Sequence, residues 1–318
     1  MDLRDGEPTG PSLFALSEGR RVARGAGTTV FAVVMHDREI DGALVARLGR
    51  AGADKVLLCE GPGLADPPLQ ATHGAALQAA VERIAPLLVL FPAGGAGPAL
   101  GPSLAARIGA AYAGAADLEV SEAGTPLDDG IGRVFLRRWR ANRAGYRRLD
   151  PVEIERPVVA IVGAGIAAPQ IGDAEIDVDV ITTAPKEIPL REIASEPDPD
   201  AAVPLARVLV LVDPALGADA VARLSAAAPH DVAVVDRARA DALLAASAPE
   251  VVVGIGDVEL PVLGTPRGRV GAILIGDGAT PPTRAVDVLW RVPSTSAGDA
   301  LWEEIARALS AFASRGPA

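Results

Sequence analysis

Short apolar runs alternate with Ala-rich segments along the first part of the chain. Apolar, partly β-branched runs predict strands at 28–35, 55–58, 87–91, 157–162 and 176–182. Helices are predicted before the first strand, at 11–23, and between later strands, at 41–52, 71–84 and 99–108. The second of these helices has Asp41 as a candidate N-cap and Gly52 as its stop. Continuous apolar strands that alternate with helices indicate a mostly parallel sheet with helices on both faces.

The alternation of predicted strands and helices stops at residue 184 and restarts after residue 204. Residues 185–204 (PKEIPLREIASEPDPDAAVP) are rich in proline and acidic residues and poor in apolar runs, so they are interpreted as a linker. Strands are then predicted at 207–212, 231–235, 251–253 and 270–275, with helices at 218–227, 240–246 and 299–314. The sequence therefore predicts two α/β domains, 1–184 and 205–318, each a doubly wound, mostly parallel sheet with flanking helices.

Composition narrows the classes of function. The net charge of -11 argues against a nucleic-acid partner, because phosphate binding requires a basic face. The single cysteine, Cys59, ends an apolar run and is interpreted as a buried small hydrophobe instead of a reactive thiol. Three histidines leave few ligands for zinc, so no metal site is predicted. No Gly-x-Ser-x-Gly motif is present, and no catalytic residues are assigned.

No apolar run reaches the roughly 18 residues that a membrane helix needs. The chain also begins without an apolar signal segment. We therefore expect no membrane insertion and a cytoplasmic location.

One motif resembles the fingerprint of a dinucleotide-binding site. Residues 163–168 (GAGIAA) follow an apolar strand and fit the Gly-x-Gly-x-x-Gly/Ala fingerprint. That fingerprint requires a helix to begin there, because the helix N-terminus binds the pyrophosphate. Pro169 and Gly172 follow instead, and the next apolar run resembles a strand. A turn at a strand end is the favoured interpretation, and a cofactor site is the alternative.

A longer pattern carries a family resemblance. Phe91-Pro92-Ala93 ends a predicted strand and is followed by Gly97, Pro102, Leu104-Ala105-Ala106-Arg107 and Asp117. This order resembles the segment of electron-transfer flavoprotein α subunits that reads P-A-x-x-x-G, then P-x-L-A-A-R-L, then a later Asp. The phrase at 52–57 (GADKVL) is also typical of that family, and 135–144 (FLRRWRANRA) stands where the family has F-V-R-P-I-Y-A-G-N-A.

The resemblance extends over nearly the whole chain and implies a function. It implies a Rossmann-like first domain that packs against a β-type subunit, and a second domain that holds FAD. The chain would then be an electron carrier, without a substrate of its own, that moves electrons from a flavin dehydrogenase to an acceptor in a heterodimer. A nucleotide-binding regulatory protein is a rival, but the resemblance across both domains argues against it.

The resemblance also indicates candidate FAD-binding residues. Arg237 falls on the family's Arg beside the isoalloxazine ring, and Asp236 replaces the preceding Ser. Gly254, Ile255 and Gly256 match a Gly-Ile-Ser sequence. Asp277 and Asp287 keep the spacing of the N-K-D-x-x-x-P and A-D elements, with Ile275 in place of the Asn.

Other family features are missing. Where the family has a Gly-Gly-Arg-Gly-Leu turn, this chain has Val212 and Asp213 for the first two glycines and Pro214 for the Arg. A turn that cradles phosphate needs glycine for close approach, and an Asp faces a diphosphate badly. The loop that ends Q-T-G is absent before Pro249, and 257–261 (DVELP) lack the family's Gln and His. A cofactor-free scaffold subunit is therefore the alternative function.

Residues 133–148 form a basic segment in an acidic chain. The segment contains seven arginines, with Phe135, Trp139 and Tyr146 among them. One interpretation is a docking face for the β-type subunit or a redox partner, because Arg and Trp are favoured at interfaces. The alternative is a solvated hairpin whose Arg stems cover a sheet edge.

The start of the chain predicts an incomplete sheet. The family opens with a short apolar strand, but residues 2–6 already resemble the turn that follows it. We therefore expect the first sheet to lack a strand. Either the protein starts a few residues further upstream, or the sheet has a gap that a partner covers.

Overall fold

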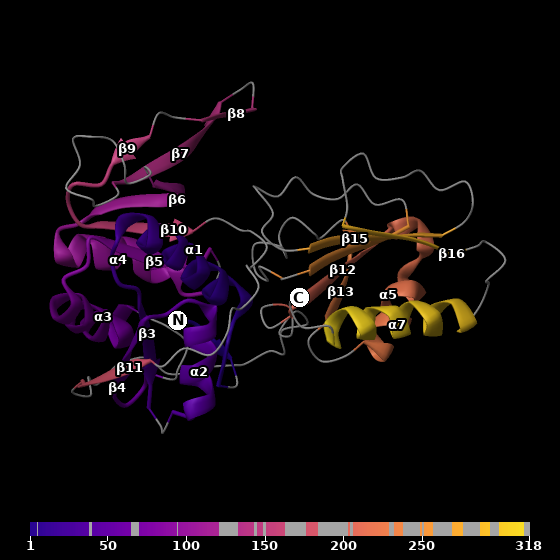
Figure 1. Ribbon diagram of the computed structural model, residues 1–318, viewed down its shortest axis with the longest axis horizontal. Helices are drawn as coiled ribbons and strands as arrows, with labels where there is room; N and C mark the ends of the chain where they lie inside the picture. Colours follow the sequence, from indigo (N-terminus) through magenta and orange to yellow (C-terminus); the bar gives the residue numbers. More distant parts are fainter. Residues whose placement is uncertain are drawn as a thin grey trace. The chain divides into compact units, whose positions relative to one another are not determined.

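The chain folds into two compact units, one from most of residues 1–195 and the other from most of 196–318. The structure is a computed structural model that describes residues 1–4, 6–37, 40–64, 70–93, 95–120, 133–142, 145–148, 151–162, 176–183, 203, 206–228, 232–237, 249, 251–256, 269–275, 287–292 and 299–314. Both units are α/β (Figure 1), which confirms the predicted fold class. The 163–168 turn, the 240–246 helix and all of the 185–204 linker except Val203 lie outside these ranges, so the domain bounds stay predictions.

The first unit contains a three-stranded parallel sheet in the order β11-β4-β3. The bounds are Phe31–His36 for β3, Lys55–Glu60 for β4 and Asp177–Thr182 for β11. Helix α2 (Gly42–Ala51) begins as predicted at Asp41, whose side chain accepts a hydrogen bond from Ala43 N at 3.0 Å. Its buried Leu48 packs against Val34 and Val56, and this apolar contact covers one face of the sheet.

A second, mixed sheet completes this unit. Its strands run in the order β5-β10-β6-β7-β8, and β9 pairs with β7. The bounds are Leu88–Phe91 (β5), Ala111–Val120 (β6), Val134–Asn142 (β7), Gly145–Arg148 (β8), Val152–Glu153 (β9) and Val158–Val162 (β10). The strands β5, β10 and β6 are parallel, whereas β7, β8 and β9 pair antiparallel. The helices are α1 (Gly10–Ala26), α3 (Gln70–Ile84) and α4 (Gly97–Ile108), and a two-strand hairpin precedes them, β1 (Leu3–Arg4) and β2 (Glu7–Pro8).

The expected break in the sheet of the first unit is confirmed among the described strands. β3 ends one sheet and β5 ends the other, and no described strand joins them. The first two residues lie in this region. The Met1 amine donates a hydrogen bond to the carbonyl oxygen of Val33 in β3 at 2.7 Å. The Asp2 carboxylate accepts one from the backbone nitrogen of Ala96, at the start of the helix after β5, at 3.1 Å.

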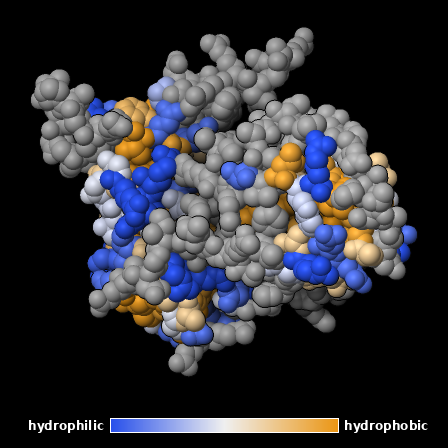
Figure 2. Space-filling model, turned by 45° about the vertical axis from the view of Figure 1, so that its right-hand side comes forward, coloured by the Kyte–Doolittle hydropathy of each residue, from blue (hydrophilic) through white to orange (hydrophobic). Residues whose placement is uncertain are grey.

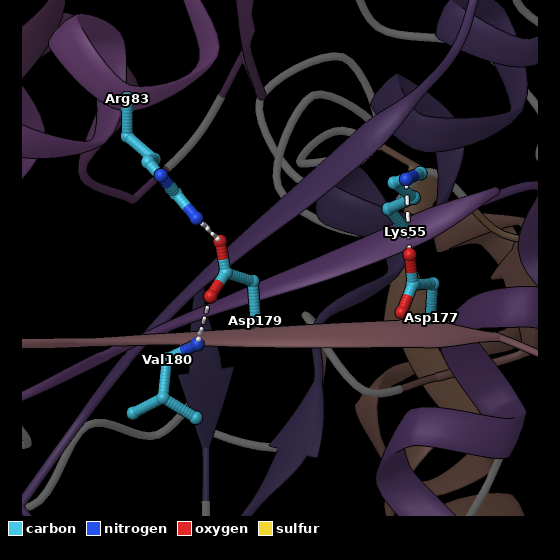
Figure 3. A network of polar contacts seen from close by, with 5 residues as sticks. All are labelled: Lys55, Arg83, Asp177, Asp179 and Val180. Carbon is cyan, nitrogen blue, oxygen red and sulfur yellow. Dashed lines mark hydrogen bonds and ion pairs between the residues drawn. The ribbon is translucent and has the colours of Figure 1, made fainter.

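Two ion pairs connect the edge strand β11 to its neighbours (Figure 3). Lys55 of β4 bonds to Asp177 at 2.9 Å, and Arg83 of α3 bonds to Asp179 at 3.0 Å. The hydrogen bond from Arg83 holds the pKa of Asp179 below its ordinary value. Because these side chains are exposed, the two ion pairs contribute little to stability, and the backbone pairing with β4 holds the strand.

The second unit is a five-stranded parallel sheet in the order β13-β12-β14-β15-β16. The strands are β12 (Val208–Val212), β13 (Val232–Asp236), β14 (Val251–Ile255), β15 (Arg269–Ile275) and β16 (Val288–Val292). A 3-10 turn, η2 (Pro214–Leu216), and helix α5 (Ala218–Ala227) follow β12, and α7 (Asp299–Ser314) closes the chain. Leu224 of α5 and Ile305 of α7 are fully buried against the same face of the sheet, in one cluster with Val253.

Within the described ranges, none of the helices has both the length and the apolar character needed to cross a bilayer. The coloured residues on the face drawn in Figure 2 include both hydrophilic and hydrophobic ones.

Burial of the Met1 amine predicts a pH dependence of stability. Burial lowers the pKa of this amine in the folded chain below the value of 8.0 that an exposed amine has. The unfolded chain then binds more protons between the two pKa values, so the free energy of unfolding should rise with pH in that window and level off above about 8. The gain is roughly 1 kcal/mol for each unit by which the pKa is lowered.

Urea unfolding at several pH values from 6 to 9 measures this effect. An NMR titration of the Met1 amine serves as the internal control, because it gives the folded pKa directly. An unfolding free energy that falls as the pH approaches 8, or an amine pKa above 8, would contradict the prediction.

Candidate functional site

The strand order of the second unit creates a topological switch point. β12, the first strand, lies between β13 and β14, so the chain leaves β12 toward one side and later crosses to the other. In open parallel sheets, ligands bind outside the carboxyl ends of the strands at such a point. The register pairs Val212 with both Asp236 and Ile255, so the three strands end at the same level. The residues that follow Val212 and Ile255 therefore line the candidate crevice.

Five of the seven predicted FAD-binding residues come to this carboxyl edge. Asp236 ends β13 and Arg237 follows it directly. Gly254 and Ile255 end β14, and Gly256 comes next. The structure thus brings together the residues that the sequence pattern selected on two separate strands.

The remaining two residues are not brought to the crevice. Asp287 precedes β16, at the amino edge of the sheet, because Val288 pairs with Gly271. The register makes Asp287 level with Val252, roughly 13 Å before Gly256 along the strand direction. Asp277 lies outside the described residues.

Asp213 is one of the residues in which the sequence departs from the family pattern, and it lies at the switch point, between the ends of β13 and β14. Its carboxylate Oδ1 accepts a hydrogen bond from Ala215 N at 2.8 Å and so caps η2. Its backbone nitrogen donates to the carbonyl oxygen of Ile255 at 3.0 Å, across the switch point. The first residue after β12 is therefore an aspartate whose backbone bonds to the end of β14 and whose carboxylate caps the turn that follows.

The space next to Gly256 is already filled. Gly256 has a φ of 89°, a backbone conformation that favours glycine. A Cβ atom added there would lie 2.7 Å from the Cβ of Asp213 and 3.1 Å from Cδ1 of Leu216. A ligand that approached the Gly256 backbone from this side would meet the same two side chains.

These residues do not fit the diphosphate of FAD, which the family resemblance implies. A diphosphate needs backbone N–H groups and a surface without anions. The crevice instead presents the Asp213 carboxylate, with a second carboxylate, Asp236, at the end of the neighbouring strand. Arg237 supplies a positive charge directly after the neighbouring strand β13. A phosphate that approached the end of β12 would still meet the Asp213 carboxylate.

In the first unit, Cys59 is buried as predicted. Its side chain packs with Leu57 and Ala76, and burial raises its pKa to about 11. The thiolate is therefore disfavoured at neutral pH. No cluster of three or more metal-ligating side chains occurs in the described part of the chain.

The basic segment forms an antiparallel hairpin. β7 and β8 pair Trp139 with Arg148 and Arg140 with Arg147. At the base of the hairpin, Arg133 forms an ion pair of 3.4 Å with Glu153. The backbone thus confirms the hairpin, and a docking role stays a prediction.

A substitution at Gly256 tests how tightly the crevice is closed. Gly256→Ala should destabilise the second unit by about 1–3 kcal/mol, because the new Cβ meets Asp213 and the positive φ is strained. Gly217→Ala is the matched control, since Gly217 has a φ of 84° with nothing within 4 Å of an added Cβ. Thermal unfolding should show a larger loss for Gly256→Ala, part of which Asp213→Gly restores. Equal losses for the two alanine variants would contradict the contact.

One protein-family model matches the part of the chain that forms the first unit. The sequence model of the electron transfer flavoprotein domain matches residues 2–194, which is more than half of the chain. This match ends before β12 and so does not include the crevice. A search of curated proteins found no match. The chain therefore belongs to the electron transfer flavoprotein domain family.

Proposed function

We propose that this chain is the α-type subunit of a heterodimeric electron-transfer flavoprotein and assembles with a β-type subunit. The family match over 2–194 supports the first part of this proposal. The α-type assignment is supported by the motif from Phe91 to Asp117 and by a second parallel α/β unit after the matched region.

The α-type motif has a clear structural role. Gly97 begins α4 so close to β5 that an added Cβ would overlap the carbonyl oxygen of Pro92. Leu104 and Ala105 are buried in the cluster that joins α4 to Phe91 and Val159. The motif thus positions a helix on the sheet, which supports a common scaffold and leaves the redox chemistry to other residues.

Two roles are compatible with such a subunit. The first is the electron carrier, which would accept electrons from a flavin dehydrogenase through FAD and operate in the cytoplasm. Arg237 at the end of β13 supports this role. The second is a cofactor-free scaffold subunit, and it is favoured by Asp213, whose carboxylate occupies the place where a diphosphate would bind. We take the scaffold as the role that this geometry supports better.

Co-expression with the β-type subunit tests the assembly. We expect a 1:1 heterodimer in size-exclusion chromatography with light scattering. Its visible spectrum then separates the two roles, because a scaffold gives a colourless complex and a carrier gives near-stoichiometric flavin absorbance. Two chains that elute separately at micromolar concentrations would contradict the proposed function.

The β7–β8 hairpin is the proposed docking element for the β-type subunit. The double variant Arg140→Glu/Arg147→Glu reverses two paired positions and should weaken the heterodimer about tenfold at low salt. Added salt should reduce this difference, because screening weakens exposed charges. Arg307→Glu in the exposed face of α7 is the matched control and should change the dissociation constant little. An unchanged dissociation constant for the double variant would contradict this docking site.

A further inference from the structure

The backbone donors at the switch point are already engaged. Asp213 N donates to Ile255 O at 3.0 Å and Ala215 N to Asp213 Oδ1 at 2.8 Å. Leu216 N and Gly217 N each donate at 3.0 Å within η2, and Pro214 has no N–H. On the facing strand end, Gly256 N donates to Ile273 O at 2.9 Å. From 213 to 217, the turn therefore has no backbone N–H left to bind a phosphate oxygen.

The helix after the turn offers a poor phosphate site as well. In nucleotide-binding α/β folds the helix begins directly after the first strand, and its positive N-terminal end binds the diphosphate. Here η2 separates β12 from α5, and Asp219 lies exposed in the first turn of α5. The negative charge of Asp219 offsets the partial positive charge of this helix end.

The charged residues described at this carboxyl edge also disfavour phosphate binding. Its described residues include three carboxylates, Asp213, Asp219 and Asp236, against the guanidinium of Arg237. An incoming diphosphate would have to displace the Asp213 side chain, break its bond to Ala215 and approach the Asp213 carboxylate itself. Each of these steps weakens binding.

We propose that Asp213 closes the switch point of the second unit to nucleotide diphosphates, so that this chain binds no FAD or other dinucleotide there. The proposal rests on the proposed function, since it selects the scaffold role over the carrier. Asp213 acts in three ways: it fills the space over Gly256, it occupies the Ala215 N–H and it repels phosphate. Any flavin of the assembly is then held by another chain or at another site.

Comparing FAD with riboflavin on the full-length chain tests this closure. The two ligands share the isoalloxazine ring, but riboflavin lacks the diphosphate and the adenosine. Equilibrium dialysis should show that the wild-type chain binds FAD no more than about threefold more tightly than riboflavin. Asp213→Gly should bind FAD about tenfold more tightly than the wild type does, with riboflavin affinity unchanged.

Two further variants separate opening of the crevice from loss of a cap. Asp41→Gly removes a cap of the same geometry from α2 in the first unit, and it should leave the affinity for FAD unchanged. Asp213→Asn retains an oxygen that can accept from Ala215 N but removes the charge. It should increase the affinity for FAD about threefold, and it replaces Asp213→Gly if circular dichroism shows that the glycine variant does not fold.

Two results would overturn the proposal. One is a wild-type chain that binds FAD tenfold or more tightly than riboflavin. The other is a folded Asp213→Gly or Asp213→Asn variant without any gain for FAD. Failure of the proposed function looks different, because it appears as a chain that does not co-purify with the β-type subunit, whatever its affinity for FAD.

Discussion

The alignment of parallel strands in the second unit is the constraint on which its function depends. Because β13, β12 and β14 run in the same direction and end at the same level, whatever residue follows Val212 stands at the carboxyl edge between β13 and β14. In nucleotide-binding folds, this is the position at which the backbone must come close to a phosphate. In this chain it is Asp213, whose carboxylate stabilises the turn through Ala215. Asp41 makes the same kind of contact, where it is an ordinary helix cap. On the proposal above, the contact of Asp213 also closes the switch point.

The two units relate differently to the family to which the chain belongs. The first unit keeps the motif that seats α4 on β5 and β10, through the close approach of Gly97 and the buried Leu104. Those interactions are apolar and steric, so they preserve the scaffold without any cofactor. In the second unit the strand order of a nucleotide-binding sheet remains, while the residues at its switch point have the wrong charge and no free donors in the turn 213–217. On the proposed scaffold role, the fold therefore persists without the chemistry that it often supports.

Much of the fold could be predicted from the sequence, because apolar runs and caps are local signals. The Asp41 cap and the buried Cys59 were expected from local residue patterns, whereas the break in the first sheet was expected from the family resemblance. β16 was missed, since its Arg291 interrupts the apolar pattern that marked the other strands. The mismatch between Asp213 and a phosphate was also visible in the sequence. Its bond to Ala215 and the filled space at Gly256 were not, because both depend on how separate strands meet.

The position of Asp287 in the sheet could not be predicted from the sequence either. Its spacing matched a family element, but spacing along the chain does not tell which edge of a sheet a residue reaches. The register of β15 and β16 places it at the amino edge, away from Asp236 and Arg237.

A crystal structure of the heterodimer grown with FAD would test the central claim most directly. The account predicts that Asp213 still accepts its hydrogen bond from Ala215 and that no diphosphate lies between the ends of β12 and β14. A diphosphate bound by the backbone nitrogens of residues 213–217 would contradict it.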